Sequence, residues 1–278
     1  MKRWFTTFAA LLFCSAALRA DVTIVQTMTM EGGMAAMAQA AGQNMSPKVT
    51  MRVKGTKMRS DVEMGTITMA TIVDLAAKEL TVINDAQKSA TVKSMAAPAA
   101  GGATPPPSVT GPTVDGSVKA TGKSQTIDGV KLDEYSFTTS MDMASISGAQ
   151  MPPEAAAAMQ GLKMNMTGSI WVAKEMQGAT EYLAFQKAAA SSDMAGAAMG
   201  ASGVSIPGMD KLMKAMGAVS GLAYLTDMNM TIDGTGQLAE MMKQMGAMKI
   251  TVKVNSVTTD AIADDQFKVP AGYTISKQ

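Results

Sequence analysis

Residues 162–172 read LKMNMTGSIWV, and this stretch decides the fold class because its apolar residues occupy every second position. Successive side chains of a β-strand point to opposite faces, so the alternation predicts a strand with one apolar face and one polar face. Residues 222–233, LAYLTDMNMTID, repeat Met-Asn-Met-Thr within the same alternation. The apolar set of the first stretch is Leu162, Met164, Met166, Gly168, Ile170 and Val172, and the polar set is Lys163, Asn165, Thr167, Ser169 and Trp171.

The same period of two recurs along the chain and predicts about ten or eleven strands. Two turns join alternating runs directly, Gly55-Thr56 and Asp128-Gly129, and each predicts a tight hairpin. Short consecutive strands separated by turn residues are typical of an antiparallel sheet. The expected strands are 21–30, 48–55, 57–64, 66–75, 79–85, 89–95, 114–127, 130–141, 162–172, 221–233 and 248–262.

Helical spacing or high alanine content marks five further segments. Helices are expected at 31–46, from Pro152-Pro153, at 178–198, at 207–219 and at 236–247. Because an antiparallel sheet with one apolar face needs a cover, we predict a mainly-β fold. Its curved antiparallel sheet would form an incomplete barrel, covered on the concave face by two or three helices. Residues 21–278 are expected to form one domain, with a flexible Pro/Gly/Ala-rich loop at 96–113.

The first twenty residues, MKRWFTTFAALLFCSAALRA, have the features of a secretory signal peptide. A basic start at Lys2 and Arg3 precedes a short apolar run, and the small residue Ala20 ends it. The apolar run is too short for a membrane span, and no later stretch is long enough for one. Cys14 is the single cysteine, so the mature chain would have none. We therefore expect export to the periplasm or the extracellular space, with no transmembrane segment after signal removal.

Charge and composition exclude several classes of function. The chain has 24 basic and 23 acidic residues, and loss of residues 1–20 leaves 21 and 23, a formal charge of −2 that argues against nucleic-acid binding. The chain has no histidine, which excludes a Ser-His-Asp triad and a His-ligated zinc. We predict that the protein is not an enzyme and has no cofactor. The candidate carboxylates are Asp133-Glu134, Asp264-Asp265 and Glu154. Adjacent acids on a strand point to opposite faces and are poor acid/base pairs, so these residues are expected to form solvated surface.

Methionine is the most unusual feature of the composition, with 28 residues after Met1 is removed. Three interpretations stay open: a packed core, a deformable wall for a hydrophobic ligand, and a Cu(I) site. A copper site would need at least three convergent methionines, since Met-x-Met alone places two side chains on one face about 7 Å apart. No residue is assigned as a metal ligand. The candidate cavity-lining residues are Met28, Met30, Met51, Met58, Met164, Met166, Met228, Met230, Ile250 and Val252.

Two further groups have a structural and a functional interpretation. Trp171 lies on the polar side of its strand and would be either half-covered by the following helix or at the rim of a cavity. The basic residues of the first hairpin are predicted to form a solvated face, which alternatively meets acidic lipid headgroups or a partner. They are Lys48, Arg52, Lys54, Lys57 and Arg59.

Four stretches together resemble a known family. They are VKGTKMRSDVEMGTITMATIVDLAAKELTVINDAQKSATV (53–92), TIDGVKLDEYSFTT (126–139), GSIWVAKE (168–175) and FKVPAGYTI (267–275). In this order they are similar to periplasmic proteins of the lipoprotein-carrier (LolA/LolB-like) superfamily, especially its secreted members with a domain of unknown function. The resemblance implies an incomplete antiparallel barrel closed by helices over an apolar cavity that binds acyl chains. It transfers no individual functional residue.

The combined prediction is a non-catalytic binding protein of the bacterial cell envelope. Its ligand would be a lipid or a lipidated protein held in a methionine-lined cavity. The alternative is a structural or interaction domain with a filled core, no ligand and a protein partner in the envelope. Methionine-based Cu(I) binding is the third hypothesis.

Overall fold

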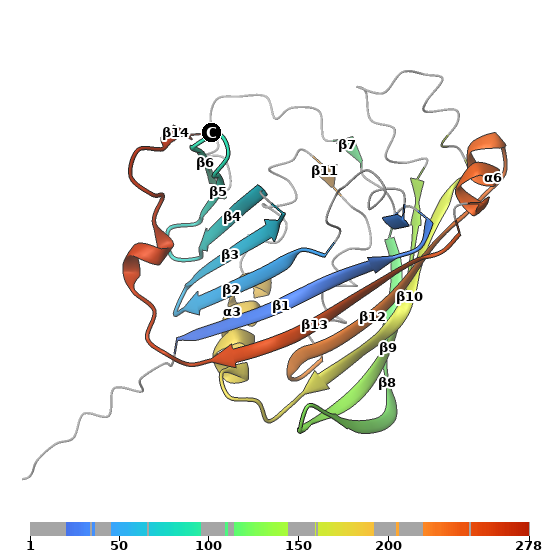
Figure 1. Cartoon of the computed structure of the whole chain (residues 1–278), viewed down its shortest axis with the longest axis horizontal. Helices are drawn as coiled ribbons and strands as arrows, with labels where there is room; N and C mark the ends of the chain where they lie inside the picture. Colours follow the sequence, from blue (N-terminus) through green and yellow to red (C-terminus); the bar gives the residue numbers. More distant parts are fainter. Residues whose placement is uncertain are drawn as a thin grey trace, which may run out of the picture.

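The computed structural model describes residues 21–33, 35–36, 46–65, 67–95, 109–110, 114–143, 159, 161–191, 204–205, 219–244 and 246–277. Twelve strands form one open sheet (Figure 1). Its strands are β1 Val22–Glu31, β2 Lys48–Lys54, β3 Lys57–Met64, β4 Ile67–Asp74, β5 Glu79–Asn84, β6 Ser89–Ser94, β8 Val114–Ile127, β9 Val130–Asp142, β10 Lys163–Ala173, β12 Leu222–Asp233, β13 Met248–Thr258 and β14 Thr274–Lys277. Two short strands, β7 Val109–Thr110 and β11 Val204–Ser205, pair in parallel separately.

The sheet consists of two antiparallel meanders joined by one late strand. Its order is β14-β6-β5-β4-β3-β2-β1-β13-β12-β10-β9-β8, so β13 lies between the first strand and β12. The sequence predicts at most eleven strands, and β14 is the strand of this twelve-stranded sheet that it does not predict. It pairs in parallel with β6, which makes the sheet mixed and corrects the prediction of a purely antiparallel sheet. The parallel direction arises because the chain leaves β13, crosses to the far edge through residues 259–273 and then enters β14.

Both predicted hairpin turns are present. Lys54 pairs with Lys57 across Gly55-Thr56, and Ile127 pairs with Val130 across the second turn. Asp128 and Gly129 have φ values of 52° and 79°, the left-handed conformations that a two-residue hairpin turn requires. The Asp-Gly pair supplies them at low cost, because glycine has no Cβ and aspartate tolerates this region.

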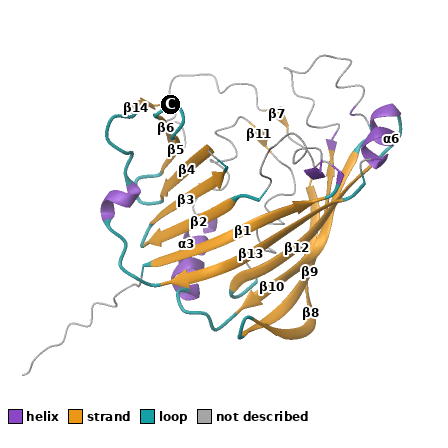
Figure 2. Ribbon diagram, in the orientation of Figure 1, coloured by secondary structure: helices purple, strands orange, loops and turns teal. Residues whose placement is uncertain are grey.

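Register shifts bend the sheet at three places. They occur between Val25 and Gln26 in the pairing of β1 with β13, between Trp171 and Val172 in β10, and between Ala120 and Ser124 in β8. Each shift adds local twist to a strand pair. The sheet therefore curves strongly but leaves β14 and β8 as separate edges at opposite sides of the molecule (Figure 2).

Two cores form, and within the first meander they lie on opposite faces of the strands: Val73 of β4 lies opposite Met58 and packs against the first core, and Ile72 belongs to the second. The first core consists of Val22, Ile24, Val53, Leu132, Ala173, Ala179, Phe185, Leu222, Tyr224 and Val254, and helix α3 (Ala179–Ser191) contributes Ala179 and Phe185 to it. The second core consists of Ala70, Ile72, Ile83, Ala90, Ile262 and Phe267. Its last two members come from the segment after β13, which includes the 3₁₀ helix η2 (Asp264–Phe267).

Two of the predicted helices have described bounds. The helix expected at 178–198 corresponds to α3, and the helix expected at 236–247 is α6, Gln237–Gln244. The helices expected at 31–46, from Pro152 and at 207–219 fall mainly outside the described residues, as do the signal peptide and most of the 96–113 loop. Figure 1 shows α3 behind β1 and β2 and α6 at the end of β12. A cover of two or three helices over the concave face is not confirmed.

Candidate functional site

All ten predicted lining residues lie on one face of the large sheet, which we call the methionine face. Residues directly opposite each other in neighbouring strands share a face, and the register connects the set strand by strand. Met30 lies opposite Ile250, which lies opposite Met228. On the other side of β1, Ile24 lies opposite Met51. The predicted residues from six strands therefore belong to one surface: β1, β2, β3, β10, β12 and β13.

The register also adds residues that sequence reasoning did not select. Met248 lies opposite Met230, and Met141 lies opposite Met164. Phe137 and Val118 continue the row that begins at Met30. Alternation within 137–141 and 248–252 was the signal that could have identified them. The methionine face as a whole adds Met141, Met248, Phe137, Val118 and Ile232 to the ten predicted residues.

The side chains of this face are half-buried. All ten predicted residues have intermediate exposure, and so do Met141 and Met248. Ile170 and Thr139 on the same face are buried. The end of the face near β1 residue Val22 packs into the first core, where Met51 and Met58 contact it.

The opposite face of the same strands is polar along most of β10, β12 and β13. Asn165 donates a hydrogen bond to Asp233 at 2.7 Å, and Thr251 donates one to Asp227 at 2.8 Å. Trp171 and Leu225, which lie opposite each other on this face, are apolar and pack against the first core as half-buried residues. The sheet thus separates hydrogen-bonding side chains from thioethers and aliphatic groups, as its alternating sequence predicts.

Gly168 lies in the middle of the methionine face, opposite Met228 and Phe137. A Cβ at this position would lie 2.0 Å from the Asp227 backbone oxygen and 3.0 Å from the Met228 Cα. Both contacts are with backbone, so a larger residue would force β10 and β12 apart. Gly168 therefore permits the close approach of β10 and β12.

A small cavity of about 80 Å³ lies elsewhere, at the ends of β9 and β10. Its lining is polar: Lys174 and Asp133 form an ion pair of 2.6 Å at its wall. The hydrogen bond from Lys174, and then that from Ser124, lowers the pKa of Asp133. The volume is well below the roughly 300–1,000 Å³ of typical ligand sites. The lining residues are Lys131, Asp133, Val172, Lys174 and Glu175, none of which was predicted to line a ligand cavity.

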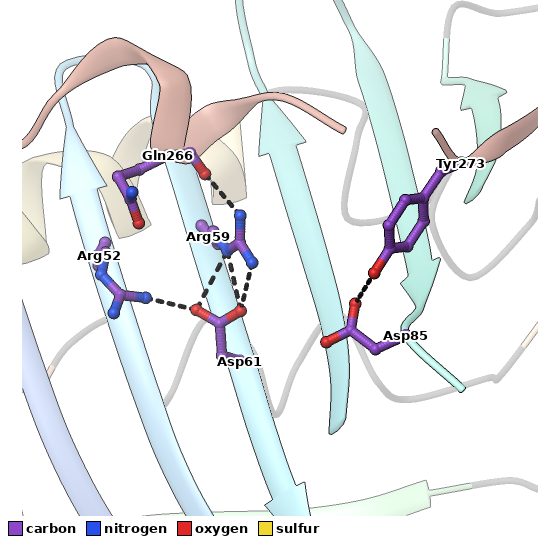
Figure 3. Close-up of polar contacts among 6 residues, drawn as sticks. All are labelled: Arg52, Arg59, Asp61, Asp85, Gln266 and Tyr273. Atoms are coloured by element: carbon purple, nitrogen blue, oxygen red, sulfur yellow. Dashed lines mark hydrogen bonds and ion pairs between the residues drawn. The ribbon is translucent and has the colours of Figure 1, made fainter. Parts of the chain in front are cut away.

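A charged cluster occupies the other face of the first hairpin (Figure 3). Arg52 and Arg59 lie directly opposite each other, and both form ion pairs with Asp61. The Arg59 Nε donates to Asp61 Oδ1 at 2.8 Å, and its Nη1 donates to the Gln266 backbone oxygen at 2.9 Å. The prediction that these arginines form a solvated face is wrong, because Asp61 and the C-terminal segment partly bury them.

The C-terminal segment is fixed by further polar contacts. Lys54 donates to the Ile262 backbone oxygen at 2.6 Å and pairs with Asp264 at 2.8 Å. This bond to Asp264 raises the pKa of Lys54 above its usual range. Figure 3 also shows Tyr273, whose hydroxyl donates to Asp85 at 2.8 Å. These groups anchor the chain end over the second core.

A second polar network lies at the tip of the β8–β9 hairpin. Asp128 accepts a hydrogen bond of 2.9 Å from the Tyr224 hydroxyl and forms a 2.9 Å ion pair with Lys253. The hydrogen bond from Lys253, followed by that from Tyr224, holds the pKa of Asp128 below its ordinary value. The network ties the hairpin tip to β12 and β13.

Two kinds of feature are absent from the described residues. No group of three or more His, Cys, Asp or Glu residues there has the arrangement of a metal site. No helix in the same part of the chain is both long and apolar enough to span a membrane.

Comparisons with known proteins give little further information. No protein-family model matches the chain, and the comparison with curated proteins returns no match. Among solved structures, the chain is similar to an uncharacterized conserved protein from Thermus thermophilus, with a TM-score of 0.39 and 6% sequence identity. The alignment covers 94% of this chain and 92% of that one. At this level of similarity the comparison carries no argument about function.

Proposed function

We propose that this protein is a non-catalytic binding protein for a lipid or the acyl chain of a lipidated protein, and that the methionine face forms one wall of its site. The observation that carries the proposal is the continuity of this face. The row Met30, Ile250, Met228, Gly168, Phe137 and Val118 runs across six neighbouring strands. An acyl chain needs a long apolar surface without directional bonds, which such a row supplies.

The choice of methionine supports a ligand of variable shape. A thioether side chain has three soft torsions and a polarizable sulfur, so it adapts to different apolar partners. The half-buried state of Met164, Met166, Met228 and Met230 leaves part of each side chain for such a contact. The polar opposite face would remain in water while the ligand lies against the thioethers.

The proposal includes a finer description of the fold and the compartment. The sheet would act as an incomplete barrel of the lipoprotein-carrier type, with helices over its concave face. The protein would be exported to the cell envelope after removal of residues 1–20, and it would receive its ligand from a membrane or from a lipidated partner there.

The first experiment is native mass spectrometry of the protein purified from an exported fraction, followed by organic extraction and lipid analysis. A fatty acid or phospholipid bound at near-stoichiometric occupancy is expected. Met164→Trp and Met230→Trp should lower that occupancy by filling space above the methionine face. Asn229→Trp is the matched control, because it adds the same group to the polar face of the same strand.

A clean mass without ligand, unchanged after incubation with fatty acid or phospholipid vesicles, would contradict the proposal. The protein would then be better described as an interaction domain with a filled core.

A further inference from the structure

Three methionines on the methionine face are direct cross-strand neighbours. Met166 on β10 lies opposite Met230 on β12, and Met230 lies opposite Met248 on β13. Directly opposite residues have Cβ atoms about 4.5–5.5 Å apart. Each sulfur lies two bonds beyond its Cβ, so the outer two side chains can turn toward the central one. The register thus brings together three thioethers that lie far apart in the sequence.

From this juxtaposition we propose that Met166, Met230 and Met248 form a three-thioether binding site for Cu(I). Thioether sulfur is a soft, neutral ligand that suits cuprous copper and binds hard divalent cations poorly. The chain has no histidine, and its single cysteine is Cys14, so these competing ligand types are absent from the described residues. Copper would bind and leave as Cu(I), with no change of oxidation state.

The surroundings of the three residues favour a monovalent ion over a divalent one. Their neighbours along the strands on the same face are apolar, namely Met164, Met228, Ile232 and Ile250. The next position across from Met166 is Thr139, a buried uncharged residue. The cost of placing a charge in an apolar site rises steeply with that charge, and none of the described residues in this row is a carboxylate that could offset it. Neutral sulfur ligands and a single positive charge are consistent with that environment.

Three other methionines of the same face lack a methionine directly opposite on the adjacent strands in the described pairings. Met28 lies opposite Val252, Met51 lies opposite Ile24 and Ser60, and Met58 lies opposite Val53 and Val73. These methionines are half-buried like the three proposed ligands but have no methionine directly across from them in the described pairings. They supply a matched control for the effect of methionine number alone.

The test is an anaerobic titration of the full chain with Cu(I) against the chromogenic chelator bicinchoninate. The wild-type protein should withdraw Cu(I) from the chelator, and the triple variant Met166→Leu/Met230→Leu/Met248→Leu should lose this competition. The control variant Met28→Leu/Met51→Leu/Met58→Leu should compete as the wild type does. Equal competition by both variants, or a failure of the wild type to compete, would overturn the proposal.

A second measurement needs no triple variant. Methyl ¹³C spectra of methionine-labelled wild-type protein, titrated with Ag(I) as a redox-stable substitute for Cu(I), should shift three signals together. Single leucine variants at 166, 230 and 248 assign those signals. Shifts spread over many methionines, or confined to others, would contradict a defined site.

The copper proposal does not depend on the lipid proposal. Leucine keeps the methionine face apolar and nearly unchanged in volume but removes the three sulfur atoms, so competition for Cu(I) by the triple variant reports on the thioethers and not on the apolar surface. The Met164→Trp variant keeps the three proposed copper ligands, so loss of lipid in that variant with unchanged competition for Cu(I) would separate the two properties.

Discussion

Asp61 compensates the positive charges of two arginines in the first hairpin. Like charges directly opposite in neighbouring strands destabilise a sheet, and Arg52 and Arg59 are such a pair. Asp61 follows Arg59 by two positions on the same face and forms ion pairs with both guanidinium groups. The sequence pattern Arg-x-Asp is therefore a charge-compensating unit and not a solvated basic surface.

We expect Asp61→Asn to destabilise the protein. The asparagine cannot neutralise the two partly buried arginines, and the loss should be about 2 kcal/mol, below the roughly 3–5 kcal/mol of a fully buried pair because Arg52 retains contact with water. Urea unfolding at neutral pH measures it. Glu63→Gln on the same strand is the control, since Glu63 is exposed. Equal unfolding midpoints for the two variants would show that the cluster contributes nothing.

At the scale of single elements, the β8–β9 hairpin is held at its tip by an acid. The pKa of Asp128 lies below its ordinary value of 3.8 because Lys253, and secondarily Tyr224, donate hydrogen bonds to it. A carboxyl whose pKa is depressed by folding adds stability above its unfolded pKa, and that stability is lost as the pH falls through the folded value. The hairpin contact should therefore weaken below pH 3.8.

The corresponding prediction is a change in pH dependence. The urea midpoint of the wild-type protein should fall more steeply on acidification below pH 3.8 than that of Asp128→Asn. Asparagine keeps the turn, because it also adopts the left-handed conformation that this position has. Asp115→Asn, an exposed change on the same hairpin, is the control and should follow the wild-type profile. If the urea midpoints of all three proteins fall equally with pH, the ionised Asp128 does not stabilise the fold.

Local pattern explains which elements could be predicted. Alternation and the Asp-Gly pair located β8 and β9 to within a residue, because both signals act over neighbouring positions. The strand expected at 248–262 instead ends at Thr258. The Ile262 amide donates to Asp21, so the chain leaves the sheet to meet a residue 241 positions away. β14 was missed for the same reason: TISK is short and exposed, and its partner is the distant β6.

For the candidate site too, local patterns could be predicted from the sequence and long-range strand pairing could not. Alternation placed Met164 and Met166 on one face of a strand, and placed Met228 and Met230 likewise. Alternation does not indicate which strands become neighbours. The row of three methionines could therefore be recognised only from the order of strands in the sheet. A one-residue difference in register would have moved Met230 to the other face.

At the scale of the whole molecule, the C-terminal segment closes one face of the first meander. Phe267 and Ile262 complete the second core against Ile72 and Ile83, while Tyr273 bonds to Asp85. The face they cover would otherwise expose aliphatic side chains to water. The segment is therefore part of the core although it contains only a short 3₁₀ turn and an edge strand.

Phe267→Ala should accordingly cost about 3 kcal/mol, the low end for removing a buried aromatic ring. The urea midpoint measures the loss, and faster proteolysis after residue 260 would show that the segment detaches. Gln266→Ala is the control, because Arg59 contacts the backbone oxygen of that residue and the side chain is exposed. A Phe267→Ala protein as stable as this control would show that the second core does not need the ring.

The position of β13 has a consequence for how the chain acquires its structure during synthesis. The first six strands can pair as they emerge, and β8, β9, β10 and β12 can do so later, yet in the described sheet nothing joins the two groups until residues 248–258 arrive. Until then β1 and β12 both present open edges, which are templates for pairing with other chains. Before β13 pairs, the protein therefore consists of two separate half-sheets, and a chaperone would protect their open edges most in that interval.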